Sequence, residues 1–577
     1  MKLIFTSTSL LLLGTVCLLA GRPAHAQWVT NPAQNTVVRD VAGVSEETPR
    51  TSPAPNGGTY VTWFETVANT NYQLRLQLLD VNGLPKLGSA GLLVSNQPQG
   101  TALYRYDLKT DNDGNAIVAF QDTRATNGST QCVIYKVSPT GQQLWGANGI
   151  QLLDATANSG LSPTIGITST NNVVVGWNAG ATADANHGTK LIPMLKFSPA
   201  GTALWSSPVR IQAPSRRFSR PIFTAVPNSD DVVVGYVEET GSGLGVSTMY
   251  AQRYNASGAA VWAAPTQVST KTIPFSFFPE PIPDGTGGYL VQVNTGNPAN
   301  ANLNDVYVQR VAADGTLPWG TTGTEVLAGT ASLRIGGSLQ YVAARGEVWS
   351  AVNELDLQQN TSGLTVQRLN PTTGAVQLGT SGVVVQAPSA TYYATQTLRD
   401  TGTGLILTYT TNTSAVNRGL WATKLNYQAQ PAWAAGPVQL SSVVSPKLGY
   451  STLPFASGQL VNVWQDERQG DGIYAQTIND SGQLGTLLGT RAGQSAELLA
   501  LIPNPGLVPS LHLTAARAQT VPVVARDLTG RLVWQAEVPL AAGATAVPLA
   551  VPGLAAGIYL VEATVDGTAW RGRWVKP

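Results

Sequence analysis

The stretch AIVAFQDTRATNGSTQCVIYKVSPTGQQLW, from Ala116 to Trp145, contains the pattern on which the whole fold depends. An apolar run that ends in an acid is followed by a polar loop, a second apolar run, and then a glycine four residues before a tryptophan. Short Val/Ile/Tyr-rich runs separated by turn residues are typical of β-strands. We therefore interpret this stretch as part of one β-sheet repeat.

The pattern recurs along most of the chain. The tryptophan or leucine that ends each copy, which we call the anchor, follows the previous anchor after 55 to 60 residues. An apolar run similar to TYVTWFE or LVNVWQD occurs eight times between or after the anchors. Each period has room for about four short strands, which is the content of one propeller blade. The sequence therefore predicts an all-β fold containing an eight-bladed β-propeller, with seven blades as the alternative. The anchors are Trp28, Leu87, Trp145, Trp205, Trp262, Trp319, Leu378 and Trp433.

The two ends of the repeat array complement one another. The last copy, Ile473 to Gly485, stops before its tryptophan and final strand, whereas Trp28 to Asp40 resembles the missing quarter at Trp145 to Asp154. A sheet built from both ends would leave no open edge in the array. We therefore expect the N-terminal strand to close the propeller.

The last copy also carries the motifs Trp-Gln-Asp-x-Arg, at Trp464 to Arg468, and Ile-Tyr-Ala-Gln, at Ile473 to Gln476. On these motifs the repeats resemble bacterial β-propeller repeats. The resemblance implies a fold and says little about function, because one fold supports many functions.

Composition and the N-terminus indicate where the protein acts. The 577 residues carry 34 Lys+Arg against 33 Asp+Glu, so there is no basic excess to neutralise phosphates, and nucleic acid is not expected as a partner. Lys2, the apolar run Leu10 to Ala20 and Ala24-His25-Ala26 predict a signal peptide over residues 1–26. No later segment is apolar enough for a membrane span. The mature chain is expected to be secreted or attached to the outer cell surface.

Reactive side chains are scarce. After the signal peptide, His187, His512 and Cys132 are the only imidazoles and thiol, which argues against a catalytic triad or a multi-histidine zinc site. Asp111 to Gly114 could suggest a calcium loop, but no glutamate follows at the required spacing, so we interpret it as a hairpin turn. No metal and no cofactor are expected.

Recurring charges are the remaining candidates for a site. Five repeats place an acid at the end of the same strand run, and six place a base on the run that follows. Acids at equivalent repeat positions have similar surroundings, whereas a glycosidase needs two carboxylates with separated pKa values. Pairing with basic side chains within or between blades is therefore favoured, with a polar rim for glycan or protein as the first alternative and catalysis as the second. The acids are Glu65, Asp122, Glu238, Glu354 and Asp466, and the bases are Lys136, Lys196, Arg253, Arg310, Arg368 and Lys424.

The pattern changes after Gly485. Residues 27–485 hold the repeats, residues 486–498 form a linker, and residues 499–577 contain short strands separated by Pro and Gly turns, the pattern of a small immunoglobulin-like β-sandwich. Gly530 and Gly557 are expected in turns that need unrestricted φ. Three motifs and a basic ending follow one another here: Pro503-Asn504-Pro505, then Asp527, Leu528, Gly530 and Arg531, then Gly553, Leu554, Gly557, Ile558 and Tyr559, and finally Lys576.

These motifs resemble the type A C-terminal sorting domain of the type IX secretion system found in the Bacteroidota. Two positions depart from the family pattern: Ile502 stands where an aromatic often precedes Pro-Asn-Pro, and Pro577 follows the usual basic ending. The resemblance implies passage through the periplasm, recognition by the type IX machinery at the outer membrane, removal of the domain, and release or attachment to surface lipopolysaccharide. For the repeats we favour non-enzymatic binding of glycan or protein. A carbohydrate-active hydrolase that uses the propeller carboxylates, or a structural surface component, are the alternatives.

Overall fold

Nearly all regular structure in the computed structural model is β-strand. Within the described part of the chain the helical exceptions are two 3-10 turns, Pro55–Gly57 and Ala343–Arg345. The chain divides into two units, Met1–Leu487 and Leu488–Pro577. The structure describes residues 28–67, 71–99, 105–125, 129–180, 189–239, 247–274, 280–297, 300–329, 332–412, 418–485, 497–498, 500–502, 508–527, 532–549, 551, 553–566 and 568–577.

Four-stranded antiparallel sheets make up the first unit, and its described residues form eight of them. Seven sheets each use four strands that are consecutive in the chain. Their bounds are β2 (Glu46–Pro53), β3 (Thr59–Val67), β4 (Asn71–Leu79) and β5 (Leu92–Ser95); β6 (Asp107–Thr110), β7 (Ala116–Asp122), β8 (Gln131–Val137) and β9 (Ile150–Leu152); β10 (Leu161–Ile167), β11 (Val173–Gly180), β12 (Lys190–Phe197) and β13 (Val209–Ile211); β14 (Phe218–Ala225), β15 (Val232–Glu239), β16 (Ser247–Tyr254) and β17 (Thr266–Gln267); β18 (Ile282–Pro283), β19 (Tyr289–Asn297), β20 (Asn300–Val311) and β21 (Thr324–Glu325); β22 (Leu333–Val342), β23 (Glu347–Leu355), β24 (Ser362–Leu369) and β25 (Val383–Ser389); β26 (Tyr392–Asp400), β27 (Leu405–Asn412), β28 (Arg418–Leu425) and β29 (Val438–Ser445).

The remaining sheet of this unit combines its two ends. Strands β30 (Lys447–Thr452), β31 (Gln459–Asp466) and β32 (Gly472–Asn479) are completed by β1 (Thr36–Arg39). β1 pairs antiparallel with β32, with Thr36 opposite Ala475 and Val37 opposite Tyr474. The pairing predicted for the N-terminal stretch is therefore present.

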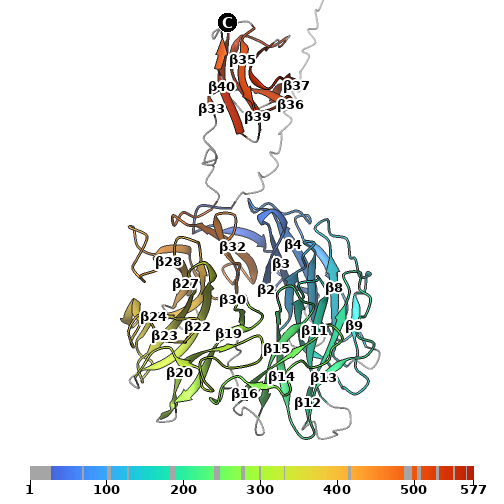
Figure 1. Cartoon of the computed structure of the whole chain (residues 1–577), viewed down its shortest axis with the longest axis vertical. Helices are drawn as coiled ribbons and strands as arrows, with labels where there is room; N and C mark the ends of the chain where they lie inside the picture. Colours follow the sequence, from blue (N-terminus) through green and yellow to red (C-terminus); the bar gives the residue numbers. More distant parts are fainter. Residues whose placement is uncertain are drawn as a thin grey trace, which may run out of the picture. The chain divides into compact units, whose positions relative to one another are not determined.

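The sheets succeed one another around a common centre, which is the organisation of a β-propeller. The first strand of one sheet contacts the first strand of the next, as β2 contacts β6 and β6 contacts β10, and β2 also contacts β30 of the last sheet. In Figure 1, β2 and β30 lie near the middle of this unit, whereas β9, β13 and β24 lie toward the outside. The hydrophobic core is correspondingly divided into clusters between neighbouring sheets. One such cluster joins Trp28 and Val463 of the last sheet to Val61 of the first.

The Gly-x-x-x-Trp pattern arises from packing between sheets. The glycine of one repeat lies on the tryptophan of the repeat before it: Gly201 has φ +85°, and a Cβ there would lie 2.8 Å from the Trp145 ring. Only glycine combines that backbone conformation with so close an approach. Where the underlying residue is leucine rather than tryptophan, at Leu378, the position above it is occupied by Ala429, which keeps the positive φ of 60°.

The described residues of the C-terminal unit form one five-stranded and one three-stranded sheet. Burial alternates along its strands, and the inward side chains form one core that includes Leu511, Val523, Val561 and Trp574. The five-stranded sheet has the order β33 (Glu497–Leu498), β40 (Thr568–Lys576), β39 (Gly557–Val565), β36 (Gln519–Arg526) and β37 (Leu532–Leu540); the three-stranded sheet has the order β34 (Ala500–Ile502), β35 (Ser510–Ala515) and β38 (Gly543–Pro548).

One prediction for this unit is wrong. Gly557 does not occupy a turn with positive φ; it is the first residue of β39 and pairs with Lys576. The positive φ, 76°, belongs instead to Gly553. Gly530, the other glycine predicted in a turn, lies outside the described residues.

Candidate functional site

The five candidate acids occupy equivalent places in their sheets. Each lies at or near the end of the second strand, and we call this set the acid belt: Glu65 on β3, Asp122 on β7, Glu238 on β15, Glu354 on β23 and Asp466 on β31. Most of these carboxylates are buried, and Asp122 and Asp466 are 0% exposed. An ionised group without water must find a cationic or hydrogen-bonding partner. The function of the belt therefore depends on what each acid contacts.

Asp466 is the most completely satisfied member. It accepts hydrogen bonds from Ser445 at 2.5 Å, Trp464 Nε1 at 2.8 Å and Arg468 at 2.6 Å, and the Lys447 ammonium lies 3.3 Å away. Burial alone would raise the pKa of Asp466, but the Arg468 hydrogen bond and the Lys447 charge outweigh it and lower the pKa. Asp466 is therefore a fixed anion.

The other belt acids also contact arginines of the same or the adjoining sheet. Asp122 binds Arg124 at 2.6 Å, and Glu354 lies 3.5 Å from Arg334 and accepts a hydrogen bond from Thr365. The remaining pairs are Glu65 with Arg39 at 2.9 Å and with Arg75 at 3.0 Å, and Glu238 with Arg216. Acid–base pairing, the favoured interpretation of the sequence, describes all five acids.

The predicted basic partners are different from the observed ones. In the β7–β8 pair, Asp122 is opposite Gln131, whereas Lys136 is opposite Ile117, which lies five residues before Asp122 on β7. Five residues of strand span about 17 Å, so the recurring acids and the recurring bases lie at opposite ends of each sheet. The belt acids instead use Arg39, Arg75, Arg124, Arg216, Arg334, Lys447 and Arg468.

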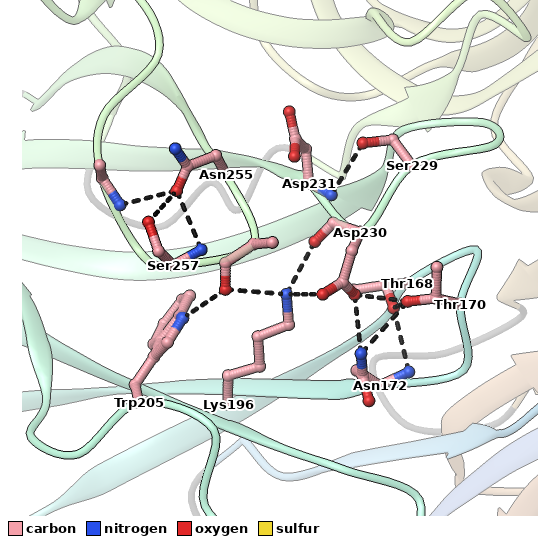
Figure 2. Close-up of polar contacts among 12 residues, drawn as sticks. Thr168, Thr170, Asn172, Lys196, Trp205, Ser229, Asp230, Asp231, Asn255 and Ser257 are labelled. Atoms are coloured by element: carbon pink, nitrogen blue, oxygen red, sulfur yellow. Dashed lines mark hydrogen bonds and ion pairs between the residues drawn. The ribbon is translucent and has the colours of Figure 1, made fainter.

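The recurring bases form a second set, the base belt, which joins neighbouring sheets. Figure 2 shows Lys196 of β12, whose ammonium binds the Asp230 carboxylate at 2.6 Å and the Asp230 carbonyl at 2.8 Å, both from the next sheet. It also lies 3.4 Å from the carbonyl of Ala256, which accepts a hydrogen bond from Trp205 Nε1 at 2.9 Å. Lys196 is 0% exposed. Although burial raises the pKa of Asp230, the hydrogen bond from Lys196 and those from neighbouring polar side chains lower it overall.

The same geometry recurs around the unit. Each base-belt cation donates to a backbone carbonyl in a turn of the next sheet, at 2.9–3.4 Å. In most repeats the anchor tryptophan donates to the same carbonyl. The base belt therefore has a structural role, because its hydrogen bonds join each sheet to the next. Its pairs are Lys136 with Pro199, Lys196 with Ala256, Arg253 with Ala313, Arg310 with Pro371, Arg368 with Tyr427, and Lys424 with Asp480.

Asp111 to Gly114 form the turn between β6 and β7, as predicted. Asp111 accepts hydrogen bonds from Asn115 and lies 2.7 Å from the Lys136 ammonium, so this carboxylate already has a cation. Gly114 has a φ of 83°. Within the described ranges no group of three or more His, Cys, Asp or Glu side chains could hold a metal ion.

Sequence reasoning missed Glu46, the first residue of β2. It lies opposite Glu65 in the sheet, its side chain is 0% exposed, and its carboxylate is 3.7 Å from the Arg39 guanidinium that already binds Glu65. Burial, with a contribution from the Glu65 charge, raises the pKa of Glu46 to about 8. Glu46 has no equivalent in the other repeats at sequence level, so periodicity gave no signal for it.

The scarce nucleophiles do not assemble into a site. Cys132 lies on β8 with 0% exposure, and burial raises the pKa of its thiol, so it is held as an inert thiol. His512 lies on β35 of the other unit, and His187 falls outside the described residues.

The sorting-domain motifs are described only in part. Pro503, Asn504, Pro505, Leu528, Gly530 and Arg531 fall outside the described residues, and Asp527 directly follows β36. Gly553 and Leu554 precede β39, and Ile558 and Tyr559 lie on it. Lys576 donates to the Leu554 carbonyl at 2.7 Å, which ties the basic ending to the third motif.

A cavity of about 290 Å³ lies where the first strands of several sheets converge. Residues of β2, β6, β10, β14 and β30 line it, together with Glu280 and Pro281 just before β18. Because β14 and β30 belong to sheets that are not neighbours, this space is at the centre of the propeller. A second cavity of about 700 Å³ shares Ile165 and Phe223 with the first. The central space is therefore a concave surface on which a ligand could be held.

No protein-family model matches the sequence, and no curated protein matches it. Among solved structures, a protein of unknown function from Dyadobacter fermentans is 12% identical with a TM-score of 0.34, over 56% of this chain and 93% of that one. A Penicillium chrysogenum alpha-L-arabinanase complexed with arabinobiose is 13% identical with a TM-score of 0.33, over 57% and 98%. A Bacillus halodurans xylan beta-1,4-xylosidase is 9% identical with a TM-score of 0.29, over 77% and 97%.

Proposed function

We propose that the chain is a secreted, closed eight-bladed β-propeller that binds a glycan or protein ligand without chemical catalysis, and that it is exported through the type IX secretion system by its C-terminal unit. The eight sequence repeats and the eight described four-stranded sheets support the blade count. The central cavity supports binding.

The observation that carries the non-enzymatic proposal is the state of the acid belt. A glycosidase needs two carboxylates that face the same substrate, one of them able to hold a proton near neutral pH. Here Asp122, Glu65 and Asp466 each face a cation at 2.6–3.3 Å and are almost fully buried. Glu46, whose raised pKa of about 8 lets it hold a proton near neutral pH, is 0% exposed. Carboxylates in this state hold the sheets in place and cannot reach a glycosidic bond.

The test separates binding from catalysis. The purified chain is incubated with a panel of polysaccharides, and both retained ligand and released reducing ends are measured. We expect retention without release. Release that is lost on changing two belt acids, and retained on changing the other three, would establish the hydrolase alternative.

Export is proposed from the N-terminal and C-terminal sequence features, and the independent packing of the C-terminal unit is consistent with a separable signal. The signal peptide would direct the chain across the inner membrane, and the C-terminal unit would be recognised at the outer membrane and removed. We expect cleavage between Gly485 and Leu499, because segments that connect separately packed units are preferred sites of proteolysis.

Deleting residues 499–577 tests this proposal. The truncated chain should accumulate, folded, in the periplasm, and the surface form of the intact chain should lack those residues. Cell fractionation combined with C-terminal mass spectrometry measures both. Recovery of Lys576 and Pro577 on the surface protein, or normal export of the truncated chain, would refute the sorting assignment.

Ring closure has its own test. Deleting Trp28 to Asp40 removes β1 and the Trp28 side chain, whose Nε1 donates to the Val81 carbonyl of the first sheet at 2.8 Å. The last sheet would then have an open edge. We expect a lower and broader thermal transition and aggregation measured by light scattering; an unchanged transition would contradict closure.

A further inference from the structure

The central cavity of the propeller carries an arrangement of charges that the acid and base belts do not explain. Its lining includes the cations Arg50, Arg105 and Lys109 and the carboxylates Asp107 and Glu280. The two carboxylates are already engaged. Asp107 accepts hydrogen bonds from the Leu108 and Ile165 backbone at 2.9 Å and lies 3.6 Å from Lys109, and Glu280 binds Arg105 at 2.7 Å.

Arg50 is the cation that these carboxylates leave without a counter-ion. In the described part of the chain no carboxylate lies within ion-pair distance of its guanidinium, and its buried Nε has no hydrogen-bond partner. The guanidinium stacks over the Tyr106 ring at 5.7 Å. Arg50 is half-buried, and a buried guanidinium donor without a partner is costly to fold and well suited to bind an anion.

Arg399, on β26, is a second arginine, which does not line the cavity itself but contacts a residue that does. It donates to the carbonyls of Leu398 at 3.0 Å and of Thr452 at 3.4 Å, and Thr452 itself lines the cavity. Its buried Nε also has no partner. Burial lowers the pKa of Arg399 to about 10, and the charge of Glu280 only partly opposes this shift. An additional negative charge in the cavity would therefore be favourable.

The rest of the lining is suited to a polyhydroxylated ligand. Hydroxyl groups of Thr51 and Ser451 meet at 2.7 Å across the boundary between the first and last sheets, and the Phe223 ring contributes an apolar surface. Ligand sites typically combine such apolar surface with a few polar groups, in volumes of roughly 300–1,000 Å³. A volume of about 290 Å³ suits one sugar unit better than a large ligand.

We propose that this central cavity binds an acidic sugar unit, with its carboxylate held by Arg50 and Arg399 and its hydroxyl groups facing the threonine and serine side chains. This inference rests on the proposed binding function and names its ligand class. The same carboxylate could arrive on a free monosaccharide or at the end of a polymer, and the experiment distinguishes the two.

The test is calorimetric titration of the purified full chain with glucuronic acid, galacturonic acid, an oligogalacturonide, a neutral oligosaccharide of the same length, and inorganic sulfate. Arg50→Gln should weaken binding of the acidic sugars about tenfold or more, the loss expected for one charge-assisted contact. Arg50→Lys should restore part of it. Arg216→Gln makes the same change at the partner of Glu238, outside the cavity; it is the matched control and should leave binding unchanged. Circular dichroism melting identifies any variant that fails to fold.

Tighter binding of the oligogalacturonide than of the free acids assigns a polymer, and equal binding assigns the single sugar. Sulfate bound as tightly as the sugars, or acidic sugars bound equally by Arg50→Gln and the unaltered chain, overturns the inference. Retention of neutral glycans alone overturns the ligand class but leaves the proposed binding function standing. Cleavage of the oligogalacturonide leaves the site standing but overturns the non-enzymatic proposal.

Discussion

The two ends of each propeller sheet use charge differently. At the acid-belt end, anions such as Asp122 and Asp466 bind cations close in sequence, at Arg124 and Arg468, so the pairs are local. At the base-belt end, Lys196 reaches Asp230 and Ala256 in the next sheet. Apart from Glu65, which also binds Arg39 of the last sheet, the acid-belt pairs lie within single sheets. At the other end, every base-belt cation donates to a carbonyl of the next sheet. Charges that recur at one repeat position thus have a shared structural role before any functional one.

The largest effect is expected at the base-belt end. Lys196→Met removes a fully buried cation and leaves the Asp230 carboxylate without its main partner, a change that typically costs 3–5 kcal/mol (about 4 kcal/mol here). Urea denaturation measures the loss. The double variant K196M/D230N, which also removes the stranded charge, should recover part of it; no recovery would mean that the ion pair is not what stabilises this position.

At the acid-belt end, Glu46 predicts a pH dependence. Its pKa is about 8 when folded against an ordinary value of 4.5, so the folded state holds an extra proton between these values and stability falls as pH rises from about 4.5 to 8. Glu46→Gln should remove this fall and raise stability above pH 8 by an amount on the order of a few kcal/mol. Melting temperatures from pH 5 to 9 test this. A parallel pH profile in the two proteins would contradict it.

Gly201 and Gly141 sharpen the comparison between tryptophan and leucine repeats. Both have φ near +85°, but a new Cβ would lie 2.8 Å from Trp145 at Gly201 and 3.2 Å from Leu87 at Gly141. Gly201→Ala should therefore cost about 2–3 kcal/mol, and Gly141→Ala about 1 kcal/mol, mostly from backbone strain. Thermal melts of the two variants make the comparison, and equal losses would show that the indole contact does not matter.

The smallest effect is expected at Glu238, whose partner Arg216 has a side chain 45% exposed. Exposed ion pairs contribute about 0–1 kcal/mol. Glu238→Gln should therefore change stability by less than about 1 kcal/mol in urea denaturation. A loss comparable with that of Lys196→Met would contradict the distinction between the two belts.

Much of the fold could be predicted from the sequence because the same pattern of strands and turns recurs eight times. The strand runs, the turn at Asp113-Gly114 and the pairing of β1 with β32 follow from local pattern and from the missing quarter of the last repeat. The partners of the charges could not be predicted in the same way. Antiparallel register decides which side chains meet, and it separates Asp122 from Lys136 along the sheet. Arg124 and Arg216 lie in loops without periodicity, and Arg50 and Thr452 line one cavity only because the first and last sheets are neighbours.

The sheet that combines both ends of the propeller has a consequence for the timing of folding. Asp40 and Tyr474, which bond across this sheet, are 434 residues apart in the chain. At ordinary synthesis rates the second partner emerges roughly 20–90 s after the first. Until then Trp28 and β1 have no sheet to join, and contacts between such distant residues are slow to form. A chain interrupted anywhere before residue 472 lacks β32 and cannot complete the last sheet. The last sheet therefore forms only after all the other propeller strands have been synthesised.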